Sequence, residues 1–201
     1  LHELVMAFLG CNYPVPPRML ILCEQIVKNY LSMELCGTTT QADKFDVFAT
    51  EGGTAAMAYL FESLASNGLL KPGDKVAMIT PIFSPYLEIP CLPKYGLEIV
   101  EIKADEDLNW QVPTAELEKL LSPEIKLLFM VNPTNPTSVK LSNKVLSELA
   151  GIVNDKRQDL MIVTDDVYAT FSDDFRSLFS VCPYNTLCVY SFSKYFGVTG
   201  W

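Results

Sequence analysis

Short apolar runs alternate with amphipathic segments along most of the chain. The runs are rich in Val, Ile, Leu and Phe, as buried strands are, and the segments between them have apolar residues at helical spacing. Continuously apolar strands indicate a mostly parallel sheet covered on both faces by helices, hence an α/β fold. Strands are predicted at 45–49, 76–79, 97–102, 126–131, 160–164 and 186–191, helices at 55–66, 114–121 and 142–154, and a turn with a helix start at 81–90.

The first forty residues have a different pattern. Apolar spacing predicts helices over residues 1–15 and 18–35, with a loop between them at a cluster of prolines. Gly37 and the threonines after it end the second helix. We therefore divide the chain into an N-terminal helical segment, 1–40, and an α/β domain, 41–201.

Composition and charge narrow the possible functions. With 201 residues, 49% of them hydrophobic, the chain is long and apolar enough to fold around a core. Its net charge of −9 and lack of Lys and Arg runs disfavour nucleic acid and anionic lipid surfaces as partners. No apolar run approaches the roughly 18 residues that a membrane span needs, and no signal sequence is recognised. We expect a cytoplasmic protein.

Cysteine usage does not suggest a metal site. The six cysteines form no Cys-x-x-Cys pair, and His2 is the only histidine, so the sequence predicts free thiols and no bound metal.

A glycine turn lies between the first predicted strand and the helix at 55–66. Such a turn exposes backbone N–H groups at the positive end of a helix dipole, which suits a phosphate. Gly52 and Gly53 allow close approach, and Thr54 offers an N-cap oxygen and a hydroxyl donor. Taken alone, the turn fits an ordinary helix cap better than a phosphate site.

Polar residues follow several of the predicted strands. They occur at 80–83, 132–136, 165–168 and 191–194. Each is a plain solvated loop when taken singly. Because ligands of parallel α/β sheets bind where the strands end, these segments and the glycine turn together predict a binding site.

Lys194 follows the apolar run 187–190, which is interpreted as a buried strand. A lysine at the end of such a strand suits covalent bonding to an aldehyde such as that of pyridoxal 5′-phosphate (PLP). PLP also needs a phosphate site, an acid at the ring nitrogen, donors to its phenolic oxygen and a flat surface against its ring. The candidates are Lys194 for the aldehyde; Gly53, Thr54, Ser191 and Ser193 for the phosphate; Asp165 for the ring nitrogen, with Asp166 as its structural neighbour; Asn135 and Tyr168 for the phenolic oxygen; and Phe83 for the ring face.

Four of these segments resemble the class I/II aminotransferases of PLP fold type I. They are Gly52 to Thr54, Asn132 to Pro136, Thr164 to Tyr168 and Ser191 to Lys194, in the family's order and spacing. The resemblance implies the fold type I large domain and PLP as cofactor. It implies the same roles for Lys194, Asp165, Tyr168, Asn135, Phe83, Ser191, Gly53 and Thr54, and Lys194 would also move the substrate α-proton.

Further stretches most resemble the branch of this family that acts on aspartate and also removes its β-carboxylate. The resemblance implies transamination between aspartate and a 2-oxo acid, and release of CO2 to leave alanine. A class I/II aminotransferase of another amino acid remains the alternative. The stretches are 12–16, 51–57, 80–90 and 190–201.

The resemblance also implies parts that this sequence does not include. A phosphate-binding Arg would follow Trp201, and a small C-terminal domain would supply an Arg for the substrate carboxylate. Since Leu1 starts without Met in a helical pattern, we expect a fragment of a longer protein. Family members are homodimers or larger homo-oligomers, and Tyr13 is the candidate for a tyrosine lent to the neighbouring subunit.

Two other interpretations remain open. Ser191 and Lys194 also match the Ser-x-x-Lys pattern of penicillin-binding proteins and β-lactamases, although no Ser-Asp-Asn or Lys-Thr-Gly motif follows. Alternatively, the chain is a truncated, non-catalytic large domain that serves in dimerisation or another interaction.

Overall fold

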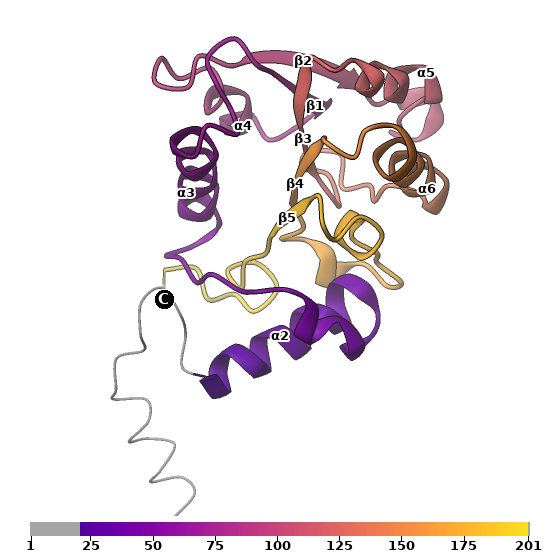
Figure 1. The fold of residues 1–201 in the computed structure, drawn as a ribbon. Helices are drawn as coiled ribbons and strands as arrows, with labels where there is room; N and C mark the ends of the chain where they lie inside the picture. The colour runs from indigo at the N-terminus through magenta and orange to yellow at the C-terminus, as the bar shows by residue number, and fades with distance from the viewer. Residues whose placement is uncertain (1–20, 201) are drawn as a thin grey trace, which may run out of the picture.

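The computed structural model describes residues 21–200, and its centre is a five-stranded sheet. The strand order is β2-β1-β3-β4-β5, and every neighbouring pair is parallel, which confirms the predicted α/β class. Figure 1 shows the sheet between two groups of helices. The strands are β1 Lys75–Thr80, β2 Glu98–Lys103, β3 Ile125–Val131, β4 Met161–Asp165 and β5 Thr186–Val189.

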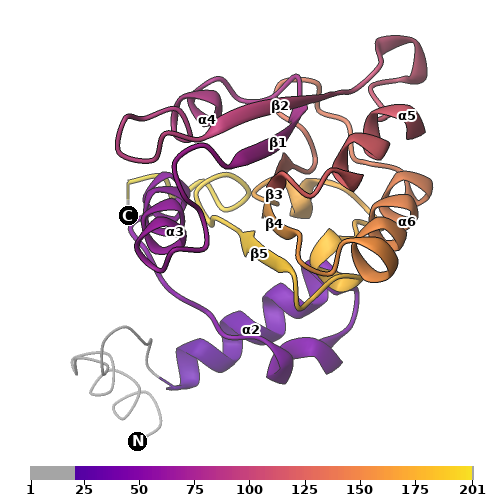
Figure 2. The ribbon, with the colours of Figure 1, turned by 45° about the horizontal axis from the view of Figure 1, so that its top comes forward.

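Five α-helices surround the sheet in the described part of the chain. α3 and α4 cover one face, α5 and α6 cover the other, and α2 lies alongside the β5 end (Figures 1 and 2). A 3-10 turn, Glu118–Leu121, follows α5, and a π turn, Ile152–Lys156, follows α6. The helices are α2 Ile21–Cys36, α3 Gly53–Ser66, α4 Pro85–Glu88, α5 Thr114–Leu117 and α6 Asn143–Gly151. Separate 3-10 turns are Thr39–Lys44, Glu106–Leu108, Ala169–Phe171 and Leu178–Ser180.

The core has one apolar layer on each side of the sheet. Alternate residues of β3 face opposite ways, so Phe129 packs with Phe61 of α3, whereas Leu128 lies in the layer that contains Leu149 of α6. All of these side chains are buried. Because both layers need apolar residues, the inner strands are continuously apolar, as the sequence indicated.

The predicted strand at 45–49 is wrong. The segment pairs with none of the five described strands, and Phe48 is 59% exposed. An apolar run forms a strand only where a neighbouring strand accepts its backbone hydrogen bonds. The last strand also ends earlier than predicted, at Val189, and its Leu187 is 44% exposed because β5 is at an edge of the described sheet.

Side chains of helix α2 contact residues near the carboxyl end of β5, which are distant from α2 in the sequence. Leu35 packs on Ala169 and Phe175. Three hydroxyl groups bond mutually: Tyr30 to Tyr190 at 2.8 Å, Tyr30 to Thr170 at 3.0 Å and Thr170 to Tyr190 at 2.7 Å. The described part of the 18–35 prediction is confirmed by α2, whereas the predicted helix over 1–15 and Tyr13 lie outside the described residues.

Between residues 21 and 200, no helix has the length and apolar character needed to cross a membrane. The same residues contain no group of three or more His, Cys, Asp or Glu side chains suited to holding a metal ion.

Candidate functional site

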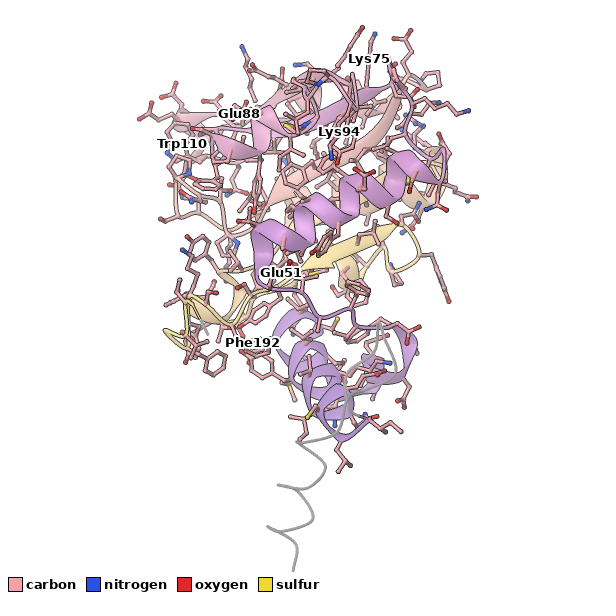
Figure 3. All side chains as sticks on the ribbon, turned by 90° about the vertical axis from the view of Figure 1, so that its left-hand side faces the viewer. Glu51, Lys75, Glu88, Lys94, Trp110 and Phe192 are labelled. Carbon is pink, nitrogen blue, oxygen red and sulfur yellow. The ribbon has the colours of Figure 1, made fainter. Side chains whose placement is uncertain are left out.

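The segments predicted to form a site lie at the carboxyl ends of the strands. Figure 3 shows the start of α3, where Glu51 is labelled, beside the yellow segment that follows β5 and carries Phe192. Because all five strands are parallel, the segments after β1, β3, β4 and β5 leave the sheet at the same edge.

The start of α3 meets the segment after β5. Gly52 is the N-cap, with φ at +106°, a value that favours glycine, and no described side chain caps the first-turn N–H groups. A Cβ atom placed on Gly53 would lie 3.8 Å from the Cβ atom of Ser191. The free N–H groups of the first turn and the Ser191 side chain therefore lie close together, as they would on either side of a bound phosphate.

Thr54 was predicted to be the N-cap of this helix, and that prediction is wrong. The helix starts at Gly53, so Thr54 lies inside the first turn, where its side chain is exposed. Gly52 takes the N-cap position because its positive φ is open to glycine and strained for other residues.

Ser191 and Ser193 belong to one tight turn. The backbone N–H of Ser193 donates to the Ser191 hydroxyl oxygen at 3.2 Å, and Thr199 donates its hydroxyl to the Ser193 carbonyl at 3.0 Å. The Ser191 hydroxyl hydrogen is left to donate to another group.

Asp165 is the last residue of β4 and is 5% exposed. Its Oδ2 accepts the Tyr86 hydroxyl at 2.6 Å, and its Oδ1 accepts the Val167 N–H at 3.1 Å. Burial raises the pKa of Asp165 above its ordinary value, against the lowering effects of those two donors and of the Lys194 charge. The carboxyl group is therefore buried, held by two donors and within the field of Lys194.

Lys194 lies in the turn after β5 and its side chain is exposed. Lys194 follows the last strand, as predicted, but it is not buried at the strand exit, because β5 stops at Val189 and the chain leaves the sheet before it reaches Lys194. Its ammonium group makes no hydrogen bond or ion pair with any residue from 21 to 200, so it can react with an aldehyde at the site once deprotonated.

Phe83, which lies between β1 and α4, forms an aromatic pair with Tyr86 of α4. Phe83 is 42% exposed, and its ring meets the Tyr86 ring at a centroid distance of 5.4 Å and an angle of 84°. Phe83 is therefore not a core residue and leaves part of its ring open for another ring. Tyr86 was not among the residues predicted from the sequence, although its position three residues after Phe83 in a helix start indicates a shared face.

Asn135 and Tyr168 are both half-buried at neighbouring strand ends. The Tyr168 ring lies 6.2 Å from that of Phe171. Neither side chain forms a hydrogen bond within the described part of the chain, so both polar ends are free to bind a ligand.

Asp166 is fully buried, and its contacts differ from those of Asp165. Thr164 donates to its Oδ1 at 2.5 Å, and the Cys188 thiol donates to its Oδ2 at 3.3 Å. Burial raises the pKa of Asp166 to about 7, against lowering by hydrogen bonds from Ser177, Thr164 and Cys188. The hydrogen-bond partners of Asp166 are thus different residues from those of Asp165.

These residues fit a phosphorylated pyridine that carries an aldehyde. The uncapped start of α3 and Ser191 suit the phosphate, the buried Asp165 suits a cationic ring nitrogen, and Lys194 supplies an amino group for the aldehyde.

Known sequences that are similar to this chain are aminotransferases, a family whose cofactor fits the site described above. A profile described as "Aminotransferase class I and II" matches residues 22–201. A Pseudomonas protein named "Bifunctional aspartate aminotransferase and L-aspartate beta-decarboxylase" is 59% identical over all 201 residues, which cover 38% of that protein. "Aromatic-amino-acid aminotransferase 2" of Thermococcus litoralis is 32% identical over 137 residues, covering 66% of this chain and 34% of that protein.

Solved structures share the fold. Aspartate aminotransferase from Thermus thermophilus with maleate superposes with a TM-score of 0.80 and 24% identity, over 99% of this chain and 49% of that one. Aromatic aminotransferase from Pyrococcus horikoshii OT3 gives a TM-score of 0.78 and 27% identity, over 100% of this chain and 51% of that one. The chain thus spans about half the length of these structures and less of the sequence relatives.

Proposed function

Because the chain belongs to the class I and II aminotransferases, a PLP-dependent family, we propose that it forms the cofactor-binding part of an enzyme that acts on L-aspartate. The enzyme transfers the amino group between aspartate and a 2-oxo acid, and also releases the β-carboxylate as CO2 to leave alanine. The observation that carries this proposal is the 59% identity, over the whole chain, to the Pseudomonas protein named for both activities.

The geometry supports a role for each residue in holding the cofactor. Gly53 and Thr54 in the first turn of α3 bind the phosphate, together with Ser191 and Ser193. Phe83 packs its exposed face against the ring. The side chains of Asn135 and Tyr168 donate hydrogen bonds to the phenolic oxygen of the cofactor.

Asp165 and Lys194 perform the proton chemistry. When bound, PLP supplies an electron-withdrawing ring that takes up the electron pair released at the substrate carbon. The Asp165 carboxylate keeps the ring nitrogen protonated, because an ion pair in a buried position favours the charged form of both partners. Lys194 binds the aldehyde covalently and, after substrate has displaced it, moves the α-proton as a base.

The wider organisation is part of the proposal. Residues 41–201 form the PLP-binding large domain, which a small C-terminal domain follows in the whole protein, and residues 1–40 border the active site or the subunit contact. The protein acts in the cytoplasm as a homodimer or larger homo-oligomer. Tyr13, outside the described residues, is the candidate tyrosine lent to the neighbouring subunit.

The test uses the purified protein, in the longest form in which the chain occurs, with PLP and aspartate labelled with ¹³C at the β-carboxylate. Labelled CO2 together with alanine supports decarboxylation, and a new amino acid formed from an added 2-oxo acid supports transamination. Turnover of another amino acid in preference to aspartate would overturn the substrate assignment. Absence of turnover with any amino acid, although PLP is bound, would overturn the assignment as an enzyme.

A further inference from the structure

A buried hydrogen bond joins the predicted ring-nitrogen partner to a residue with no role so far. The Tyr86 hydroxyl donates to Asp165 Oδ2 at 2.6 Å, across 79 positions in the sequence. Building on the proposed function, we propose that Tyr86 is a positioning residue that keeps the Asp165 carboxylate ionised and oriented toward the ring nitrogen of the cofactor. Tyr86 itself need not touch the substrate or the reacting atoms.

The Tyr86 ring is fixed by its neighbours. It packs edge to face against Phe129 of β3 at a centroid distance of 4.9 Å and against Phe83 at 5.4 Å. The Tyr86 N–H also donates to the Phe83 carbonyl at 2.9 Å. With 8% of its surface exposed, Tyr86 has little freedom to turn, so its hydroxyl is held on Asp165.

Tyr86 remains a donor across the working pH range. Burial raises the pKa of the Tyr86 phenol far above its ordinary value, and the charge of Asp165 and its hydrogen bond with Tyr86 act in the same direction. A phenol that keeps its proton can only donate to a carboxylate. Asp165 then has two fixed donors, Tyr86 on Oδ2 and Val167 on Oδ1, and each oxygen keeps a lone pair for a further partner.

The hydrogen bonds from Tyr86 and Val167 decide whether a proton between Asp165 and the ring nitrogen of the cofactor lies on the carboxylate or on the nitrogen. Burial alone favours the neutral carboxylic acid, whereas a hydrogen bond to the charged form favours the carboxylate. With Tyr86 donating, Asp165 has a lower proton affinity, so a proton between Asp165 and the ring nitrogen lies on the nitrogen. Without the Tyr86 hydroxyl, the proton moves toward Asp165, which leaves the carboxyl group protonated and the ring nitrogen neutral.

The first test needs no cofactor. The side-chain carboxyl carbon of Asp165 is titrated by ¹³C NMR in the wild type and in Tyr86→Phe, which keeps the ring and removes the donor. We expect the Asp165 pKa to rise in the variant. The matched control is Tyr95→Phe, because Tyr95 is also buried in the same core layer but donates to Glu62, at 3.2 Å. An Asp165 pKa that is unchanged in Tyr86→Phe, or moves equally in the control, overturns the proposal.

A second variant covers the case in which Tyr86→Phe does not fold. Replacement of Tyr86 by 3,5-difluorotyrosine keeps the hydroxyl and makes it a stronger donor, so the Asp165 pKa is expected to fall. No change, or a rise, contradicts the proposal.

The second test uses PLP labelled with ¹⁵N at the ring nitrogen and bound to each protein. We expect a protonated-nitrogen shift in the wild type and in Tyr95→Phe, and a displacement toward the unprotonated value in Tyr86→Phe. Equal shifts in all three proteins refute the inference and leave the proposed function standing. Failure of the wild type to bind PLP refutes both.

Discussion

A Cβ atom added to Gly53 would stand 3.8 Å from the Cβ atom of Ser191, although the two residues are far apart in the sequence. Gly53 opens α3, and Ser191 is the second residue after β5. The contact brings the free N–H groups of a helix start to a serine hydroxyl, which is why we place the phosphate there.

A methyl group at Gly53 should occupy part of this phosphate site. Gly53 does not have a positive φ, and 3.8 Å is an ordinary contact distance, so Gly53→Ala is expected to fold. Losing one charge-assisted hydrogen bond costs about 1.5 kcal/mol, so PLP should bind about tenfold more weakly in an absorbance titration. Gly151→Ala is the control, since a Cβ atom added there would meet no atom within 4 Å apart from its chain neighbours and the backbone of its own helix. Equal PLP affinity in both variants would place the phosphate elsewhere.

Asp166 should make stability depend on pH. Its pKa is about 7 in the folded protein and about 3.9 in an unfolded chain, so the folded state holds more protons between these values. The stabilisation is therefore complete below about pH 4 and is lost as the pH rises through about 7. Urea unfolding across this range should give a flatter profile for Asp166→Asn than for the wild type. Parallel profiles would show that Asp166 is ionised in the folded protein.

The three mutually bonded hydroxyls should hold α2 on the sheet. Tyr190→Phe removes the hydroxyl that both Tyr30 and Thr170 contact. Because the net value of a partly buried hydrogen bond is about 1 kcal/mol, the free energy of unfolding should fall by about that amount. Tyr184→Phe, at a fully exposed tyrosine, is expected to change it little. If both variants unfold at the same urea concentration, the Tyr190 hydroxyl contributes no stability.

The order of strands and helices from residue 75 onward followed from local patterns. Parallel strands with two buried faces have apolar runs that a single sequence reveals, and their polar ends fall at one edge. Asp165 was identifiable in this way as an acid at the end of a buried strand. The predicted strand at 45–49 failed because pairing depends on a neighbour that no local pattern specifies.

Contacts between segments that are far apart in the sequence could not be predicted from local sequence patterns. Tyr86 is a routine aromatic in its own stretch, and its role depends on a hydrogen bond to Asp165 that only the folded chain creates. The exposure of Lys194 depends equally on where β5 stops, and apolar residues continue past that point to Tyr190.

The covalent bond between Lys194 and PLP is the central claim. The most direct measurement is an absorbance spectrum of the purified protein with PLP, then borohydride reduction and peptide mapping of the wild type, Lys194→Ala and Lys144→Ala. Lys144 is a suitable control because it is an exposed lysine of α6. We predict a visible band and a reduced adduct on Lys194 in the wild type and in Lys144→Ala, and neither in Lys194→Ala. An adduct that persists in Lys194→Ala at another lysine would contradict the account.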